Sequence, residues 1–343
     1  MDNNTHTTYI KELSHTDQVS WDSMVTHPVQ SYAWVESRKA LGIPYTLLGV
    51  FTDGTLVSVL LVILQPIFGS TFKKAQVFKG ALYTDDVYQA LYQYGRENNI
   101  AWYSFEPDVI ESATPPIPSI LYKKDVQDFA LWTPYINLDQ PYTMIENNFS
   151  KVVRNESRHA VNHGMYTKEG TDQSLFDDFI SLMFQTKERK QFSGYTKEYY
   201  KAVFTSLKFH QQVSIFITYT QEGNPVAGAL VFDFKDTLYY AYAGSLGRET
   251  PKGAMYLLVI SIIQYGQAQG KKTLDLFGSL DPSYVGNHPW KGFSQFKKSF
   301  NGIYKKYIGR YDLVVSPLYY RLYYMYVWLK SHVAFFKNLC TLK

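Results

Sequence analysis

The chain contains almost no cysteine and no long apolar run. Cys340 is its single cysteine among 343 residues, which excludes an internal disulfide framework and a cysteine-ligated metal cage. The longest apolar run, Leu56 to Leu64, is too short to cross a bilayer. The first residues, MDNNTHTTYIKEL, are polar and mixed in charge, unlike a signal peptide. We therefore expect a cytoplasmic protein.

Motifs of the common nucleophilic and metal-dependent enzymes are also missing. The sequence has no G-x-S-x-G elbow, and its cysteine has no histidine partner at a recognisable spacing. His159 and His163 have the i, i+4 spacing of two ligands on one helix face, but no third ligand follows. Arg154 and Arg158 lie among them, so we interpret this helix as a solvated basic face. We expect no metal and no bound cofactor.

The composition is that of a folded protein with room for two domains. Hydrophobic residues make up 45% and charged residues 19%, unlike a disordered chain. The net charge of +4 is small, so binding of an anion must depend on local clusters of basic residues. Aromatic residues reach 17%, including 30 tyrosines, which suit the gripping of sugars and peptides.

One such cluster runs from Pro289 to Arg310, PWKGFSQFKKSFNGIYKKYIGR. It has no acidic residue, an aromatic residue every three or four positions, and six basic ones: Lys291, Lys297, Lys298, Lys305, Lys306 and Arg310. Ammonium groups that neutralise phosphates beside rings that stack on bases or sugars suit a polyanionic substrate. The alternative is a strand or loop with core aromatics and solvated lysines.

The two halves of the chain repeat the order helix, hairpin, strand, helix, strand. Asp53-Gly54 and Glu222-Gly223 each separate two apolar runs, which predicts a hairpin in each half. The repeated order indicates a duplication and an α/β layered fold with mixed sheets. The helices expected around the two hairpins cover residues 31–42, 87–98, 141–164, 173–187, 197–209 and 252–270.

Several motifs in this order resemble those of the Fem family, the aminoacyl-tRNA-dependent ligases that build peptidoglycan cross-bridges. The pattern G-x-x-x-F-K-x-x-F-x-G resembles the family's C-terminal signature, through Gly292, Phe296, Lys297, Phe300 and Gly302. The other matches are Trp34 with Arg38 (a lysine in the family), Glu106-Pro107, the basic helix KVVRNESRHAVNHG, Thr186 to Arg189, LYYAYAGS and LDLFGS.

The resemblance implies a fold of two tandem GNAT-like (acyl-CoA N-acyltransferase-like) domains with mixed central sheets. We expect the first domain at residues 1–138 and the second at 139–315, with a C-terminal helix, 316–343, packing back on the first. No long coiled-coil arm separates the motifs of the second half. This favours the compact branch of the family.

The resemblance also implies an aminoacyltransferase of cell wall biogenesis, which moves an amino acid from aminoacyl-tRNA to an amine of a peptidoglycan precursor stem peptide. The acceptor is UDP-MurNAc-pentapeptide or lipid II, aminoacyl-tRNA is the co-substrate, and a monomer is expected. Lys297 with Phe296 would stabilise the oxyanion of the tetrahedral intermediate. The implied substrate-binding residues are Arg38, Lys39, Glu106, Arg189 and Tyr242.

Two alternatives belong to other classes. The first is a GNAT-like enzyme that uses acyl-CoA in surface polysaccharide synthesis. Arg248, Gly253 and Ala254 fit the pyrophosphate loop R/Q-x-x-G-x-G/A, but Pro251 replaces its first glycine and removes an N–H donor. The second is a non-catalytic protein whose basic segment only docks on RNA or a membrane.

The tail from Ser316 to Lys343 predicts a helix. Leu318, Leu322, Met325 and Leu329 recur at spacings of three and four. The tail also contains Tyr, Trp and basic residues but no acid, which suits the surface of an anionic membrane. We therefore predict both packing on the first domain and peripheral contact with the inner leaflet of the plasma membrane.

Overall fold

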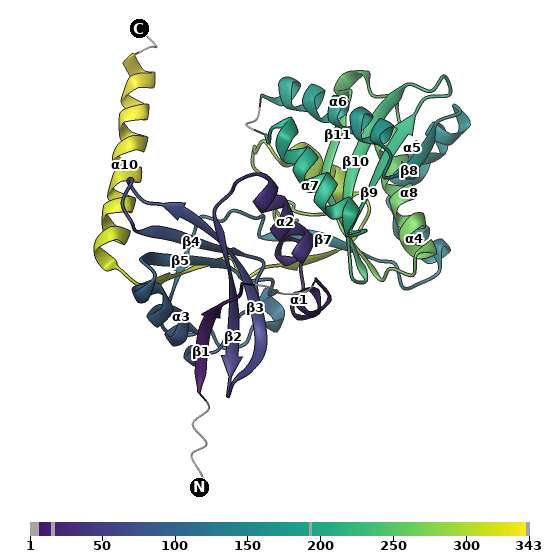
Figure 1. Ribbon diagram of the computed structural model, residues 1–343. Coiled ribbons are helices and arrows are strands. Elements are labelled where there is room, and N and C mark those ends of the chain that lie inside the picture. The colour runs from purple at the N-terminus through teal and green to yellow at the C-terminus, as the bar shows by residue number, and fades with distance from the viewer. Residues whose placement is uncertain (1–6, 15–17, 192–193, 341–343) are drawn as a thin grey trace.

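The computed structural model describes residues 7–14, 18–191 and 194–340, with side chains of the last helix described through Lys330. These residues form two mixed β-sheets with helices on their faces (Figure 1). The first sheet has the spatial order β1 (Thr8–Glu12), β2 (Tyr45–Thr52), β3 (Thr55–Pro66), β4 (Lys73–Phe78), β5 (Ile100–Glu106), β14 (Arg310–Val314) and β6 (Leu121–Lys124).

The second sheet repeats this arrangement strand by strand. Its order is β8 (Tyr166–Gly170), β9 (Val213–Tyr219), β10 (Pro225–Phe234), β11 (Thr237–Ser245), β12 (Thr273–Asp275), β7 (Trp132–Asn137) and β13 (Ile303–Lys306). In each sheet the fourth and fifth strands are parallel, as β4–β5 and β11–β12. All other neighbours in both sheets are antiparallel. The common order supports the predicted duplication.

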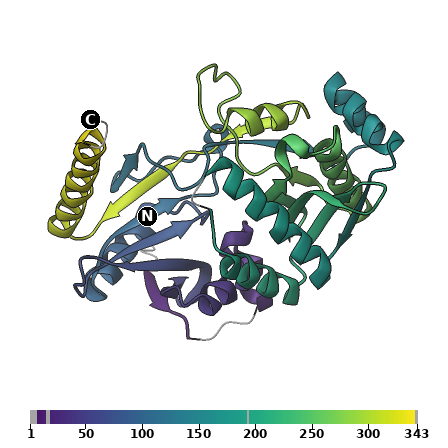
Figure 2. The same ribbon diagram turned by 90° about the horizontal axis from the view of Figure 1, so that it is seen from above.

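The two halves exchange their sixth strands. β7 precedes residue 138 in the chain but pairs with β12 and β13 in the second sheet. β14 comes from the other half and lies between β5 and β6 in the first sheet. Two segments therefore pass between the sheets, one at 125–131 and one at 307–309 (Figure 2). Sheet membership thus differs from the expected division at residue 138, because the strand before that boundary belongs to the second sheet.

Helices cover both faces of each sheet. On the first sheet, α3 (Asp85–Glu97) covers one face, and α1 (Gln18–Met24) and α2 (Tyr32–Ala40) lie on the other. On the second, α5 (Lys151–Asn162) and α8 (Ala254–Ala268) pack on one face. The other face carries α6 (Gln173–Lys190) and α7 (Lys197–Phe209).

A single apolar core joins the two halves. It contains Trp21, Trp34 and Leu61 of the first half together with Phe179 and Phe232 of the second, all of them buried. The ring centroids of Trp34 and Phe232 lie 5.6 Å apart. Because α2 packs directly on α7, the relative position of the two sheets is fixed by buried side chains rather than by the connecting segments alone.

Most expected helices are present, but the prediction of one continuous helix over 141–164 is wrong. It is divided into α4 (Tyr142–Asn148) and α5, with an extended backbone at Phe149. The Ser150 hydroxyl accepts a hydrogen bond from Val153 N and so starts a new helix. Phe149 is buried against Phe300, with a centroid distance of 5.5 Å, which holds the chain at the break.

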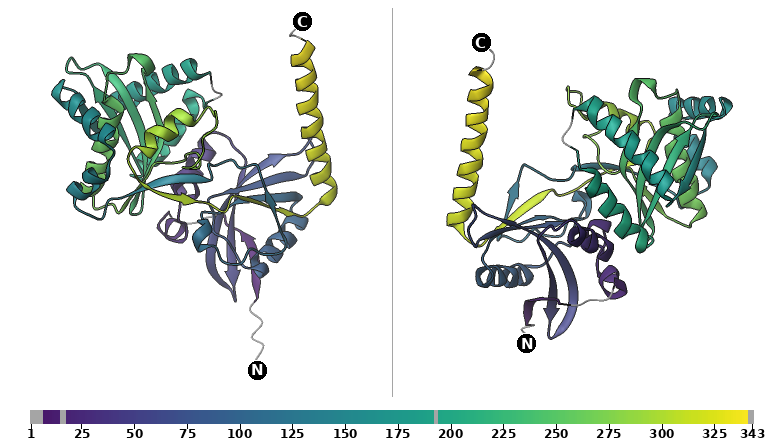
Figure 3. Two further views of the ribbon diagram at one scale, coloured as in Figure 1. Left: turned by 180° about the vertical axis from the view of Figure 1, so that it is seen from behind. Right: turned by 45° about the horizontal axis from the view of Figure 1, so that its top comes forward.

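The last helix, α10 (Pro317–Cys340), begins directly after β14. Its first turns pack on the first sheet, where Tyr319 stacks on Phe72 and Tyr320 and Tyr323 contact Trp102. Beyond these turns the helix extends away from both sheets (Figure 3). None of the helices in the described ranges has the length and apolar character needed to cross a bilayer.

Candidate functional site

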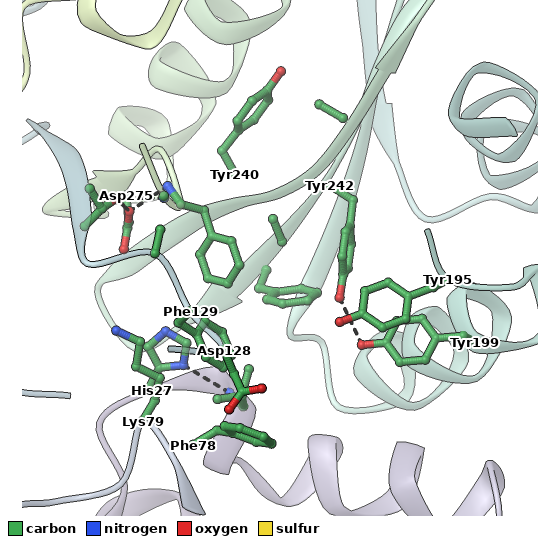
Figure 4. A pocket seen from close by; sticks show the side chains of 18 of the residues that line it. His27, Phe78, Lys79, Asp128, Phe129, Tyr195, Tyr199, Tyr240, Tyr242 and Asp275 are labelled. Atoms are coloured by element: carbon green, nitrogen blue, oxygen red, sulfur yellow. Dashed lines mark hydrogen bonds between the residues drawn. The ribbon is translucent and has the colours of Figure 1, made fainter. Parts of the chain in front are cut away.

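A cavity of about 1440 Å³ lies between the two sheets and is lined by both. β4 and α2 contribute from the first half, and β11, α6 and α9 (Lys291–Lys298) contribute from the second. The segments that pass between the sheets also line it, through Asp128, Phe129 and Tyr307. Figure 4 shows three tyrosines, Tyr195, Tyr199 and Tyr242, gathered on one side of the cavity and away from Asp275 and His27. The strand exchange therefore helps to build the cavity.

Lys297 is buried in this cavity, on the last turn of α9. Only 7% of its surface is exposed, and its Nζ donates hydrogen bonds to the carbonyl oxygens of Phe277 (3.2 Å) and Gly278 (2.7 Å). Phe277 and Gly278 have φ angles of +58° and +90°, an unfavourable backbone for a phenylalanine. This left-handed turn directs two carbonyl oxygens at one ammonium group.

Burial lowers the pKa of Lys297 to about 7, and the nearby charge of Asp275 opposes that change. Asp275 is itself buried and accepts hydrogen bonds from the Thr133 hydroxyl and from Phe277 N (2.7 Å). Burial raises the pKa of this carboxyl. Asp275 belongs to the LDLFGS motif, so the sequence offered a signal for it, although it was not among the predicted site residues.

A second buried lysine faces the cavity from the first half. Lys79 lies with its Nζ 3.0 Å from the ring centroid of Tyr307 and 3.9 Å from Asp108 Oδ1. Burial lowers its pKa to about 8, opposed mainly by Asp108. His27 lies nearby, and burial lowers its pKa to about 3, so its ring is neutral. No sequence motif pointed to Lys79 or His27.

Arg38 lies on the side of the cavity where Tyr195, Tyr199 and Tyr242 gather. Its guanidinium carbon lies 4.3 Å from the centroid of Trp34 and 5.0 Å from that of Tyr199. Tyr195 stacks on Tyr199 at 3.8 Å, and the hydroxyls of Tyr199 and Tyr242 are 3.1 Å apart. The Arg38 side chain is 7% exposed and pairs with no carboxylate among the described residues. Buried charges are normally paired, so this geometry suits an anionic ligand.

The remaining predicted residues differ in whether they line the cavity. Phe296, Tyr242 and Arg189 line the cavity, and Arg189 Nη1 donates a hydrogen bond to Ser245 O at 2.9 Å. Lys39 is exposed and does not line the cavity, since it faces away from the side of α2 that bears Arg38.

Glu106 has a different position from the one predicted for a substrate ligand. Its carboxylate is buried and accepts hydrogen bonds from Asp128 N and from Phe129 N (2.9 Å). It does not line the cavity itself, whereas Asp128 and Phe129 do. Glu106 thus positions the first segment that passes between the sheets.

Among the charged side chains of the cavity wall, basic ones predominate. Two carboxylates, Asp128 and Asp275, line it against six basic side chains: Arg38, Lys74, Lys79, Arg189, Lys190 and Lys297. No cluster of three or more side chains suited to a metal ion occurs among the described residues. The wall therefore favours an anionic, polar substrate large enough to reach both sheets.

A sequence model of the FemAB family matches residues 126–221 and 209–327, more than half of the chain. The chain belongs to the FemAB family. The matched residues include Lys297, Asp275 and Tyr242, and they leave Arg38 and Lys79 outside. No curated protein gave a significant match in sequence.

Solved structures with the same fold confirm the predicted tandem GNAT-like architecture. The crystal structure of FemX is similar over 91% of this chain and 99% of its own, with a TM-score of 0.77 and 16% identity. A tandem GNAT protein from the clavulanic acid biosynthesis pathway covers the same shares, with a TM-score of 0.55 and 11% identity. A Bacteroides thetaiotaomicron protein of unknown function has a TM-score of 0.58 and 10% identity, over 88% and 98% of the chains.

Proposed function

We propose that this FemAB-family protein transfers an aminoacyl group from aminoacyl-tRNA to an amine on the stem peptide of a peptidoglycan precursor. The observation that carries the proposal is the buried ammonium group of Lys297, in a basic cavity that spans both sheets. An aminoacyl ester is already activated, so the reaction needs no protein nucleophile. This agrees with a site that has buried lysines but no serine or cysteine motif.

In the proposed reaction, the acceptor amine attacks the ester carbonyl of the aminoacyl-tRNA. A C–N bond forms, the C–O bond to the ribose breaks, and the proton lost by the amine balances the one gained by the ribose oxygen. Negative charge develops on the carbonyl oxygen in the tetrahedral intermediate. A preorganised cation in a water-poor site stabilises such a charge strongly, and Lys297 has this role in the proposal.

The acceptor would occupy the other side of the cavity. Arg38 is rigidly held between Trp34 and Tyr199 and has no carboxylate partner among the described residues. A guanidinium group binds a diphosphate or carboxylate with two parallel hydrogen bonds. The tyrosines beside it present apolar faces and hydroxyl groups that suit a sugar or peptide. A nucleotide- or lipid-linked muropeptide carries all of these groups.

The acyl-CoA alternative is less well supported by the start of α8. Gly253 lies so close to α5 that a Cβ atom there would be 2.0 Å from Glu156 O, and Lys252 pairs with Glu156 at 3.3 Å. Residues 247–253 do not line the cavity. The backbone carbonyl of Glu156 therefore crowds the start of α8, and its carboxylate pairs with Lys252, where a pyrophosphate would need free N–H groups. Simple docking on RNA does not account for a lysine that is almost fully buried.

The test is incubation with charged tRNA and UDP-MurNAc-pentapeptide, followed by mass spectrometry of the muropeptide. We expect a muropeptide product heavier by one aminoacyl residue. Digestion of the charged tRNA with RNase beforehand should abolish its formation, and omission of acetyl-CoA and ATP should leave its amount unchanged. Lipid II replaces the soluble acceptor in a parallel reaction. A product that survives RNase and requires acyl-CoA would refute the proposal in favour of the CoA-dependent enzyme.

A further inference from the structure

The middle of α10 carries large apolar side chains that are strongly exposed in the part of the chain that the structure describes. Met325, Tyr326, Val327, Trp328 and Leu329 are consecutive, and each is between 42% and 57% exposed. Five consecutive residues cover more than one full turn, so apolar side chains face every direction around the helix. Helices that are hydrophobic on all sides are normally buried or embedded in lipid. Figures 1 and 3 show this part of α10 clear of both sheets.

The β3–β4 turn extends the same apolar surface. Phe68, at the tip of that turn, is 52% exposed. Its ring centroid lies 5.3 Å from that of Tyr326 and 6.2 Å from that of Tyr323. Two elements far apart in sequence thus present one aromatic surface, which we call the α10 surface: Phe68 with Leu322, Met325, Tyr326, Val327, Trp328 and Leu329.

The charged side chains of α10 itself are all positive. Arg321 and Lys330 are exposed at the two ends of the α10 surface, and the chain from Pro317 to Lys343 contains no acidic residue. On the neighbouring strand β6, Lys124 lies with its Nζ 4.4 Å from the ring centroid of Tyr324. The base of the helix is fixed, because the hydroxyls of Tyr320 and Tyr324 donate to Asp312 at 2.9 and 3.2 Å. The orientation of α10 relative to the first sheet is therefore set by buried contacts.

We propose that the α10 surface is a docking site for the headgroup region of an anionic phospholipid bilayer. Tyr and Trp side chains are suited to the boundary between headgroups and acyl chains. Apolar side chains flanked by basic ones bind anionic lipid through both burial and charge. Docked in this way, the first half of the protein lies against the bilayer that, if the proposed function holds, also carries the lipid-linked acceptor.

A second copy of the chain is a poorer occupant for this surface. Pairing of two helices needs an apolar seam on one side and polar residues on the others, whereas residues 325–329 are apolar throughout. Two copies would also bring Arg321 and Lys330 near each other with no acid in the helix to pair with them.

The test is co-sedimentation of the full chain with vesicles. One set contains phosphatidylcholine alone, and the other an equal mixture of phosphatidylcholine and phosphatidylglycerol. Each basic residue near the surface contributes about a fivefold gain in binding, so we expect the ratio of bound to free protein to be at least ~10-fold higher on the anionic vesicles. Equal binding to both sets would overturn the proposal.

Two double variants separate the contributions. We expect M325S/W328S to lose binding to the anionic vesicles, and R321Q/K330Q to bind them no better than neutral ones. The matched controls change exposed residues elsewhere. They are V285S/F209S for the apolar pair, whose side chains are more exposed than those of Met325 and Trp328, and K11Q/K201Q for the basic pair. These controls should bind like the unchanged protein.

Two further measurements keep this result apart from the proposed transferase activity. With a soluble acceptor and no vesicles, M325S/W328S should keep the unchanged kcat/KM, since α10 does not line the cavity. Undiminished binding of M325S/W328S to anionic vesicles would overturn the proposal. So would a dimer in sedimentation velocity that this variant abolishes, because a second copy would then occupy the surface.

Discussion

The Nζ atom of Lys297 donates a hydrogen bond to the carbonyl oxygen of Gly278 at 2.7 Å, across the floor of the cavity. Lys297 comes from α9, and Gly278 follows β12 in a left-handed turn. The contact therefore holds the buried ammonium group in one place before any substrate binds. Such preorganisation is what electrostatic stabilisation of a developing charge requires.

Replacement of Lys297 tests its catalytic role. Lys297→Met should lower kcat by roughly 10²-fold or more with little change in KM, since the interaction exists only in the transition state. Steady-state kinetics with charged tRNA measures both constants. Lys298→Met is the matched control, because Lys298 is exposed and its Nζ donates a hydrogen bond to Pro282 O, a residue that does not line the cavity. Equal and small effects of the two substitutions would contradict the assignment.

The pH dependence of kcat/KM should report the ionisation of Lys297 in the free enzyme. Its pKa of about 7 means that the ammonium form, the one we propose to be active, is lost as the pH rises through 7. In Asp275→Asn the carboxylate that raises this pKa is removed, so the alkaline limb of the profile should move to lower pH. Asp236→Asn, an exposed carboxylate paired with Lys272, should leave the limb in place. If the alkaline limb of the pH profile does not move in Asp275→Asn, Asp275 does not raise the pKa of Lys297.

Arg38 and Lys39 should differ sharply, although they are neighbours in sequence. Arg38→Ala removes a buried guanidinium from the cavity and should raise the KM for the muropeptide by about 10- to 100-fold, with kcat changed much less. Lys39→Ala should leave KM within twofold of the unchanged value, about the scale of a surface substitution. Similar KM values for Arg38→Ala and Lys39→Ala would mean that Arg38 does not bind the anionic group of the muropeptide. Arg38→Lys should recover only part of the loss, since lysine lacks the planar fork.

Glu106 should matter for the stability of the segment between the sheets. Glu106→Ala leaves the N–H groups of Asp128 and Phe129 without their buried acceptor, which should lower the free energy of unfolding by about 2 kcal/mol. Urea denaturation measures this difference. Glu111→Ala, which removes an exposed ion pair with Lys306, should cost at most about 1 kcal/mol. If Glu106→Ala loses no more free energy of unfolding than Glu111→Ala does, other contacts hold the segment between the sheets.

The pH dependence of stability gives a second measurement on Glu106. Burial raises its pKa from 4.5 to about 7, so between these values the folded protein binds more protons at this site than the unfolded chain. The contribution of Glu106 to stability therefore falls as the pH rises from 4.5 to 7. In Glu106→Gln, which does not titrate, that part of the slope should disappear. An unchanged slope would contradict the assigned shift.

The sequence by itself determined the repeated elements and part of the site. Asp53-Gly54 and Glu222-Gly223 mark their hairpins because local turn chemistry fixes such loops. The family resemblance pointed to Phe296 and Lys297, although no helix was expected over Lys291–Lys298, where the structure has α9.

Only the tertiary structure decided which distant side chains meet. The exchange of β7 and β14 depends on pairing between strands far apart in the chain, which no local pattern encodes. The burial of Lys79 beside Tyr307 follows from that exchange, because Tyr307 lies in the segment between β13 and β14. Asp275 and Lys297 meet by packing within the second half, where Lys297 Nζ also binds the carbonyl oxygens of Phe277 and Gly278. The separation of Arg38 from Lys39 likewise reflects which face of α2 is buried. Burial sets the ionisation of these groups, and burial is a property of the whole fold rather than of any segment.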